Sequence, residues 1–528
     1  MIAYVSCHKI LKMKDGQVIP NYLHIAAKTG IMERIKKLLS QQSFEVAVHD
    51  EVLETLEAVQ TFYGCSKTAK WLLKWASRCG HEKLVALLLE EDGINYDDDD
   101  KEEEYEEEEE DEDIRWTKTI SHTPLYMAAE NGHVCVVKVL LRKDSIKDER
   151  DCTIVQYENI MRALCIAAKN NHPLVVEMLL KRNDIQVNDT SVDGSTLLQW
   201  ASSNGHVEVV KHLLKMNSPE VNKKNRNNET PLQIAAKNGH HQVVEHLLRN
   251  KDILVNMAGK HGGTPLLYAS WYGHHMIVER LLMSNEINFN QVDDYGVTPL
   301  SAAALNGHHK VVEHLLRKHD ILVNLASNIG ENPLLLASWR GYLKVVELLL
   351  TRNEIHINQA TPKGATPLHV AAACGHHNVV DRLLRLNDIQ VNQADNGGFT
   401  PLMLASFNEH EKVLALLLAK HDVQVNFAAN MGQTALHLAA TKGQHKAVTL
   451  LLRKPGIQFD MLDFNGTSPL MLAANERHGS VVEAFLRSEQ MRGVVWNGWR
   501  PQRRYNPYPH NRPDLRFGVT MHRGGQKS

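Results

Sequence analysis

Small and apolar residues recur along this chain with a period of 34 residues. The clearest copy, TPLQIAAKNGHHQVVEHLL from Thr230 to Leu248, is followed by an Ile-x-Val-Asn motif and a turn. In-register copies begin at Arg162, Thr196, Thr230, Thr264, Thr298, Asn332, Thr366, Thr400, Thr434 and Ser468. A related phrase recurs out of register from Asn21, Trp71 and Ser121, which gives thirteen units. Such self-similarity indicates a solenoid, in which each unit buries its apolar face only against its neighbours.

Each unit carries the signals of two short helices. The first position is usually Thr, Ser or Asn, whose side chain accepts the unpaired N–H groups of a helix start, and proline often follows it. Small pairs such as Ala235-Ala236 allow neighbouring backbones to approach closely. A glycine at the tenth position, such as Gly239, predicts a left-handed residue that ends the first helix. Apolar pairs four residues apart, at Val243 and Leu247, then predict a second helix.

This pattern resembles the ankyrin repeat, whose signature contains Thr-Pro-Leu-His-x-Ala and the same two-helix unit. The resemblance extends over about residues 21–486. It implies an all-α fold, an ankyrin-repeat α-solenoid of helix-turn-helix units with β-hairpin-like turns. Glu409 and Arg477 depart from the pattern because they occupy the glycine position, so we expect those two turns to be strained or rearranged.

Composition divides the chain into four predicted segments. The second contains fifteen acidic residues, and the fourth has nine Lys or Arg residues against two acidic ones, interleaved with proline and aromatic residues. Like-charge repulsion and few apolar residues predict disorder in both. The segments are 1–96, degenerate repeats with an inserted helix at 45–63; 97–113, an acidic disordered insertion; 114–486, the main array; and 487–528, a basic disordered tail. Five extra residues before Arg162 predict a longer loop there.

Charge and cysteine usage suggest where the protein acts. The net charge of -3 leaves the repeat body nearly neutral once the acidic and basic segments are set aside. Seven cysteines, odd in number and scattered, favour a reducing compartment. No signal peptide and no continuous apolar run of about 18 residues is found. We therefore expect a soluble, cytoplasmic monomer that does not enter membranes, with the nucleus as the alternative location.

Enzymatic and metal chemistry have no candidate in this sequence. None of the common nucleotide-binding, hydrolase, kinase or zinc motifs is present, so we predict no catalytic residues, no cofactor and no metal. Ten of the thirty histidines follow the turn glycine, at the eleventh position of a unit. Equivalent residues of adjacent units lie about 8–10 Å apart, whereas zinc ligands lie near 2 Å from the ion. These histidines are therefore interpreted as structural.

The positions that the repeat does not fix form the candidate partner-binding surface. The resemblance implies that partners bind through the turn tips and the exposed face of the first helices. The two residues after the small pair lie on that face, and in five central units the first of them is apolar or aromatic, with Tyr272 and Arg340 beside two of them. Large aromatic residues and arginine are the usual anchors of interfaces. The alternative is that these rings pad contacts between units. The predicted binding residues are Trp271, Tyr272, Leu305, Trp339, Arg340, Phe407 and, in a turn, Tyr295.

One asparagine is a candidate modification site. The segment from Leu214 to Asn222 resembles the family's asparagine-hydroxylation pattern, with leucine eight residues before the asparagine and an acid two before it. Other units place Gln, Leu, Asn or His where Glu220 stands. Asn222 is therefore the only acceptor that we predict.

The leading functional hypothesis is a non-enzymatic scaffold or adaptor that binds a protein partner in the concave groove of units seven to eleven. Two alternatives remain open. The basic, aromatic tail has the composition to contact single-stranded nucleic acid by charge and stacking, which would make the chain a nucleic-acid-associated regulator. The array could instead serve as the substrate-recognition arm of a multi-chain enzyme such as a ubiquitin ligase.

Overall fold

The computed structural model describes residues 73–90, 123–144, 154–181, 187–188, 190, 194–216 and 219–488. The first unit near Asn21, the predicted helix at 45–63, the acidic segment 97–113 and the tail beyond residue 488 lie outside the described residues. The chain forms two compact bodies, an N-terminal body of residues 1–187 and a C-terminal body of residues 188–528.

The N-terminal body contains pairs of short helices, and α5 packs on α7, α6 on α8 and α7 on α9. Its described helices are residues 73–79, α5 (Glu82–Glu90), α6 (Pro124–Glu130), α7 (Val134–Asp144), α8 (Ile154–Lys169) and α9 (Pro173–Leu180). The predicted loop before Arg162 is wrong, because α8 begins eight residues earlier and Arg162 lies in its middle. Ile160 is buried like Ala163, Leu164 and Ala167, so the apolar helical period extends upstream of the repeat.

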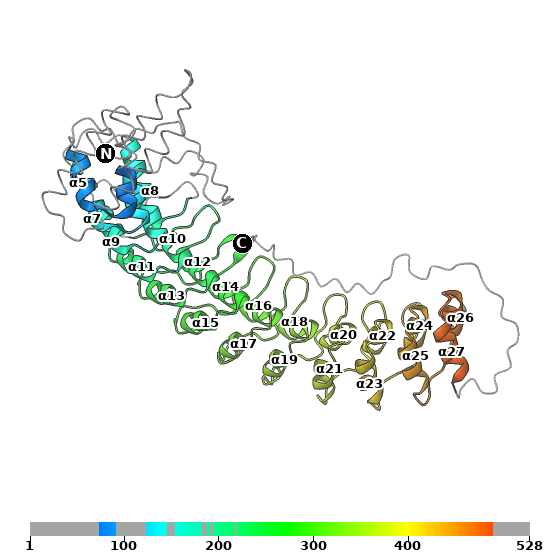
Figure 1. Ribbon diagram of the computed structural model, residues 1–528. Helices are drawn as coiled ribbons and strands as arrows, with labels where there is room; N and C mark the ends of the chain where they lie inside the picture. Colours follow the sequence, from blue (N-terminus) through cyan, green and yellow to red (C-terminus); the bar gives the residue numbers. More distant parts are fainter. Residues whose placement is uncertain are drawn as a thin grey trace, which may run out of the picture. The chain divides into compact units, whose positions relative to one another are not determined.

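The C-terminal body is a regular stack of helix pairs. Figure 1 shows one row of first helices, a second row beside it, and turns that project from the first row. The first helices are α10 (Leu197–Asn204), α12 (Pro231–Asn238), α14 (Pro265–Tyr272), α16 (Pro299–Leu305), α18 (Pro333–Arg340), α20 (Pro367–Ala373), α22 (Pro401–Phe407), α24 (Ala435–Thr441) and α26 (Pro469–Asn475). The second helices are α11 (Val207–Leu214), α13 (His241–Leu248), α15 (His275–Leu282), α17 (His309–Leu316), α19 (Leu343–Leu349), α21 (His377–Leu384), α23 (Glu411–Ala419), α25 (His445–Leu452) and α27 (Gly479–Arg487).

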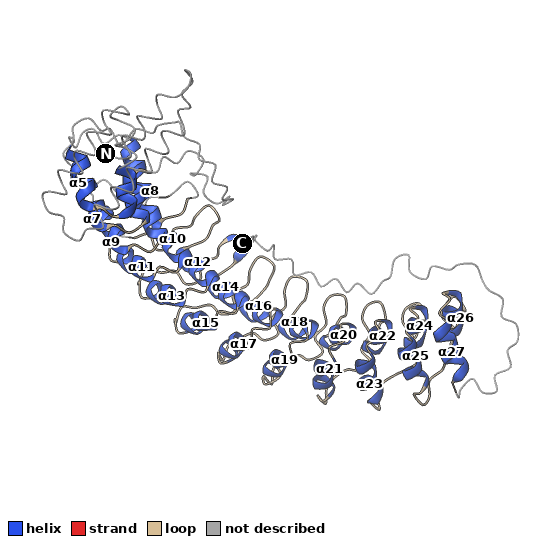
Figure 2. Cartoon of the chain, viewed as in Figure 1, coloured by secondary structure: helices blue, strands red, loops and turns tan. Residues whose placement is uncertain are grey.

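The described residues confirm the all-α solenoid. They contain helices, one short 3-10 turn (η2, Lys260–Gly262), one isolated bridge between Thr190 and Thr196, and no strand (Figure 2). Each first helix packs on the next first helix, and each second helix on the next second helix. Where the structure describes the chain, no helix is long and apolar enough to cross a membrane.

The first helices begin where the capping residues predict. Thr230 has extended backbone angles and its Oγ1 accepts the N–H of Gln233 at 3.3 Å, while the Gln233 side chain accepts the N–H of Thr230 at 2.7 Å. This reciprocal capping box pairs two N–H groups that the helix itself cannot satisfy. The Gln233 amide also donates to the carbonyl of Gly263 in the next unit, at 2.7 Å. One side chain thus starts a helix and joins two units.

The turn between the two helices of a unit is closed by an imidazole from the next unit. Gly341 has φ +76°, and the ring of His376 lies so close that any Cβ at residue 341 would collide with it. His376 Nε2 donates to the carbonyl of Trp339 at 2.9 Å, and since a carbonyl only accepts, Nε2 carries the proton. The same bond to the preceding unit is made by His133, His172, His240, His274, His308, His410 and His478. These histidines have the structural role predicted for them.

The asparagine that ends each Ile-x-Val-Asn motif joins consecutive turns. The Nδ2 of Asn324 donates to the carbonyl of Glu354 at 2.7 Å, and its Oδ1 accepts the N–H of His356 at 2.8 Å. Both amide groups are therefore paired with the backbone of the following unit. The same pair of bonds is made by Asn222, Asn256, Asn290, Asn358, Asn392 and Asn426.

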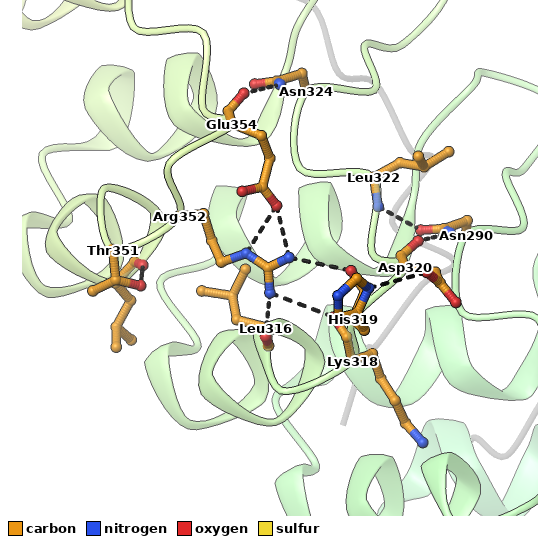
Figure 3. Close-up of polar contacts among 11 residues, drawn as sticks. Asn290, Leu316, Lys318, His319, Asp320, Leu322, Asn324, Thr351, Arg352 and Glu354 are labelled. Atoms are coloured by element: carbon orange, nitrogen blue, oxygen red, sulfur yellow. Dashed lines mark hydrogen bonds and ion pairs between the residues drawn. The ribbon is translucent and has the colours of Figure 1, made fainter.

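Arg352 joins the ends of two second helices. Its guanidinium donates to the carbonyl of Leu316 at the end of α17 at 2.8 Å and pairs with Glu354 at 2.6 Å (Figure 3). A cation is favoured there because the unpaired carbonyls of a helix end carry partial negative charge. Lys318 and Lys454 cap the preceding second helix in the same way, so this arginine is part of the scaffold.

The turns at Glu409 and Arg477, which lack the usual glycine, keep the glycine geometry. Glu409 and Arg477 have φ values of 56° and 63°, so these turns are not rearranged. After Glu409, the next unit has Gln444 where most units have histidine, and its Nε2 donates to the carbonyl of Phe407 at 3.2 Å. The Glu409 side chain also accepts the N–H of Lys446 at 3.2 Å, at the start of α25. Glutamate is tolerated here because the ring that would meet its Cβ is absent.

This coupling predicts the outcome of a mutant cycle. Gln444→His should destabilise the wild-type array by about 1–3 kcal/mol, because the ring would overlap the Cβ of Glu409. In a Glu409→Gly background the same change should cost little, since the site then matches Gly341 and His376. Urea denaturation followed by circular dichroism measures all four variants. Equal costs in the two backgrounds would show that the residues do not meet.

Candidate functional site

The eighth residue of each unit forms a column along the first helices in which large and small side chains alternate. Trp271, Trp339 and Phe407 are half-buried and are separated by 68 residues, which is two units. Leu305 and Ala373, in the units between them, are 4% and 5% exposed. Aromatic anchors therefore appear at every second unit. We use the name first-helix face for the eighth and ninth residues of five units, those that begin at Thr264, Thr298, Asn332, Thr366 and Thr400.

Leu305 does not lie on the surface, and its prediction as a binding residue is corrected. Its side chain lies in the column between two bulky rings, and the 4% of it that stays exposed offers almost no area to a partner. The padding interpretation applies at this position. Sequence reasoning missed the difference because leucine fits a partner site and a contact between units equally well.

Cations lie over two of the aromatic side chains. The guanidinium carbon of Arg340 is 4.4 Å from the centre of the Trp339 ring, and the Lys442 ammonium is 4.7 Å from that of Phe407. Both distances are within the range of cation–π attraction. Arg340 is exposed while Trp339 is half-buried, so the pair presents a charged group above an anchored ring.

Tyr272 and Tyr295 are exposed by 46% and 40%. Tyr272 stacks on His274 with ring centres 6.2 Å apart, and Tyr295 lies at a turn tip with its ring 6.1 Å from that of His261. The N–H of Tyr295 is held by Asp293 Oδ1 at 2.9 Å, so the backbone of this tip is fixed. Both tyrosines therefore offer apolar area from ordered positions.

Sequence reasoning missed further apolar turn tips. Ile329 and Met431 are 47% and 43% exposed, and each immediately precedes a turn glycine, as Tyr295 does. Phe464, at the tip of the last turn, is 77% exposed. The sequence contained a signal for Ile329 and Met431, because each is an apolar residue directly before a turn glycine. At such a turn, where the glycine has a positive φ, no neighbouring residue covers the apolar side chain.

The buried carboxyl of Glu331 was also missed. Glu331 directly precedes the helix cap Asn332 and is 2% exposed, and its Oε2 has no hydrogen-bond partner. Glu229 occupies the same position three units earlier, and its Oε1 pairs with Lys237, an eighth-position residue, at 3.0 Å. In the unit of Glu331 the eighth position is Trp339, so no lysine is available there.

Burial has a measurable electrostatic effect on Glu331. Loss of solvation raises the pKa of this carboxyl from 4.5 to about 7. Burial also raises the pKa of Asp293, although backbone N–H groups oppose that shift. For two histidines that cap first helices the effect is opposite, since burial lowers the pKa of His437, and that of His369 to about 4.

No metal site emerges from the described residues. No three His, Cys, Asp or Glu side chains in this part of the chain are grouped closely enough to hold a metal ion. The adjacent pair His240 and His241 illustrates the reason. His240 is bonded to the carbonyl of Ser203 in the preceding unit, and His241 begins the next helix.

Asn222 makes the same bonds as its equivalents. Its Nδ2 donates to the carbonyl of Asp252 at 2.6 Å and its Oδ1 accepts the N–H of Leu254 at 2.9 Å. The preceding Glu220 forms an ion pair with Lys223 at 2.9 Å. Hydroxylation of Asn222 remains a prediction from the sequence.

The buried carboxyl predicts how stability depends on pH. Because the pKa of Glu331 is higher in the folded chain, folding favours its protonated form, and this contribution is lost as pH rises from about 4.5 to about 7. Glu331→Gln should therefore be more stable than wild type at pH 8, by about 1–3 kcal/mol from the size of the shift. The difference should vanish at pH 4.5 and below.

Urea denaturation of both proteins at pH 4.5 and pH 8 tests this. Histidine titration contributes equally to wild type and variant, so it cancels in the comparison. Glu229→Gln is the matched control and should give no gain at pH 8, because its carboxylate is already paired with Lys237. Equal stability of wild type and Glu331→Gln at pH 8 would contradict the assignment.

A comparison with protein-family models agrees with this architecture. The family model "Ankyrin repeats (3 copies)" matches residues 6–151, 108–190, 125–225, 164–257, 198–293, 266–361, 351–429 and 423–493. No curated protein matches the chain. Among solved structures, the human ASB11 ankyrin repeat domain is 29% identical, with a TM-score of 0.39, and the match covers 44% of this chain and 100% of that one. Because the family model matches well over half of the sequence, this chain belongs to the ankyrin-repeat family.

Proposed function

We propose that this chain is a non-enzymatic scaffold or adaptor that binds a protein partner along the first-helix face and the adjacent turn tips. Ankyrin repeats are generally protein-interaction modules, which supports the claim that the chain binds a protein partner. The claim that the partner binds along the first-helix face rests on one observation. Aromatic side chains are half-buried at every second unit, at Trp271, Trp339 and Phe407. Large aromatic side chains held in partly covered positions are the usual energetic centres of protein interfaces.

The spacing of these anchors suits an extended segment. Neighbouring helices pack about 8–10 Å apart, so anchors two units apart are separated by roughly 16–20 Å. An extended chain advances about 3.3–3.6 Å per residue, so five or six residues join one anchor to the next. A partner segment of about ten to twelve residues would reach from Trp271 to Phe407. Tyr295 and Ile329, at the turn tips, would add contact area along its edge.

A protein partner fits this face better than a nucleic acid. The exposed side chains are mostly apolar and aromatic, whereas nucleic-acid surfaces need a run of Lys and Arg along the backbone path. The basic segment that suggested nucleic-acid binding lies, beyond residue 488, outside the described residues. If the chain is instead the substrate-recognition arm of a ubiquitin ligase, the substrate would bind to the same face. The chain would then also bind the other chains of the ligase. The proposal puts a monomeric chain in the cytoplasm, with the nucleus as the alternative.

Affinity purification with the full chain tests the proposal. The double variant Trp271→Ala/Trp339→Ala should capture its partner at least about 30-fold more weakly, since truncating an interface anchor typically costs 2 kcal/mol or more. The control Met276→Ala/Met283→Ala removes two exposed side chains from the second-helix side, which are 51% and 62% exposed. Proteins captured by wild type and the control but lost with the tryptophan variant support the proposal. Equal capture by all three proteins contradicts it.

A further inference from the structure

The unit that begins at Asn332 departs from the repeat pattern more than its neighbours do. It has asparagine rather than threonine at the cap, Trp339 and Arg340 on the first-helix face, and Tyr342 where most units have histidine. The buried Glu331 directly precedes it. Each departure changes a position on or beside the first-helix face. The apolar positions that hold the stack together, such as Leu335 and Ala337, remain buried as in other units.

Another unit of the array shows how a carboxylate at the position of Glu331 can be paired. At the equivalent position three units earlier, Glu229 Oε1 lies 3.0 Å from the ammonium of Lys237. The same ammonium is 5.9 Å from the ring of Tyr268 in the next unit. A carboxylate at this backbone position is therefore within reach of a cation at the eighth position of a first helix. The Glu229 side chain is 13% exposed and the Lys237 side chain is 39% exposed, so the carboxylate is the shielded member of the pair.

Glu331 has the carboxyl of this pair without the cation. Its Oε2 and the Nδ2 of the adjacent Asn332 are both buried and without a hydrogen-bond partner. Leaving a buried carboxyl unpaired is unfavourable, because the group loses its hydration without gaining a hydrogen bond in the protein. Ser270 and Ser338 also have an unpaired hydroxyl, but a hydroxyl is neutral, whereas the Glu331 carboxyl can carry a negative charge. The carboxyls of Asp293 and Asp463 each have one unpaired oxygen, but their Oδ1 atoms accept two backbone N–H groups each. The described residues therefore contain a buried carboxyl, that of Glu331, without a cation paired to it.

We propose that Glu331 anchors a lysine or arginine side chain of the bound partner segment, which inserts beside Trp339 and pairs with the Glu331 carboxylate as Lys237 pairs with that of Glu229. This inference rests on the proposed function and specifies the chemistry of the partner. The carboxyl is already removed from water in the free protein, so pairing it with a cation adds attraction without a further loss of its solvation. The guanidinium carbon of Arg340 lies 4.4 Å from the centre of the Trp339 ring, so a cation is favoured against this ring.

A random decapeptide phage library panned on the full-length chain identifies the preferred segment directly. Panning in 0.5 M salt screens exposed charges, but screens a buried ion pair much less. Wild type should select peptides with Lys or Arg at one fixed position and apolar or aromatic residues five or six positions away. Glu331→Gln should lose the basic preference and keep the apolar one. Glu229→Gln is the matched control and should keep both.

Fluorescence anisotropy with one selected peptide gives the size of the effect. We expect Glu331→Gln to weaken binding at least tenfold, and Glu229→Gln less than twofold. Replacing the basic residue of the peptide with norleucine should weaken binding to wild type tenfold and to Glu331→Gln hardly at all. Glu331→Ala provides a second variant, because alanine occupies the equivalent position at Ala365.

The outcomes separate this inference from the proposed function. Selected peptides that lack a basic residue, or that bind Glu331→Gln as tightly as wild type, overturn the cation site and leave the first-helix face as the binding surface. Peptides whose binding survives Trp271→Ala/Trp339→Ala overturn the location of that face. Selection of no peptide at all overturns both proposals.

Discussion

The structure depends on one contact between consecutive units, the imidazole of one unit placed against the turn glycine of the unit before it. At the glycine turns the contact combines a residue without a side chain, a left-handed backbone there, and a proton on Nε2 that reaches a carbonyl. His376, with Gly341 and the Trp339 carbonyl, shows all three. Since each unit contacts only its neighbours, the stability of the stack is a sum of such interfaces.

This contact also connects the scaffold to the candidate binding surface. The carbonyl that each imidazole holds belongs to the eighth residue of the preceding unit, the residue whose side chain forms the first-helix face. His308 holds the backbone of Trp271 at 2.9 Å and His376 that of Trp339 at 2.9 Å. The backbone of the binding column is therefore fixed, while its side chains are free to differ from unit to unit. Rigid anchors of this kind lose little conformational freedom when a partner binds.

Departures from the repeat have two physical meanings in this array. At Glu409 the departure is compensated, because the following unit has Gln444 instead of histidine and the glutamate side chain gains a bond to Lys446. At Glu331 it is not compensated, since the eighth position that supplies Lys237 to Glu229 supplies a tryptophan instead. Local rules that are broken without internal compensation tend to mark functional positions. That contrast is the reason for assigning a partner to Glu331.

The sequence alone determined the periodic part of this protein. The 34-residue period, the capping threonines and the turn glycines predicted the helix pairs, because these signals act within a few residues of the chain. They also predicted the structural role of the histidines. The loop expected before Arg162 was wrong, since α8 continues an apolar period that the repeat signature does not include.

Only the tertiary structure decided which side chains of the binding column remain accessible. Leu305 and Trp339 occupy equivalent positions, yet one is buried and the other half-exposed, because exposure depends on the bulk of neighbours 34 residues away in each direction. Glu331 looks like any polar residue near a turn until the stack encloses it. Burial and pairing across units are properties of the stack, and no local pattern in the sequence carries them.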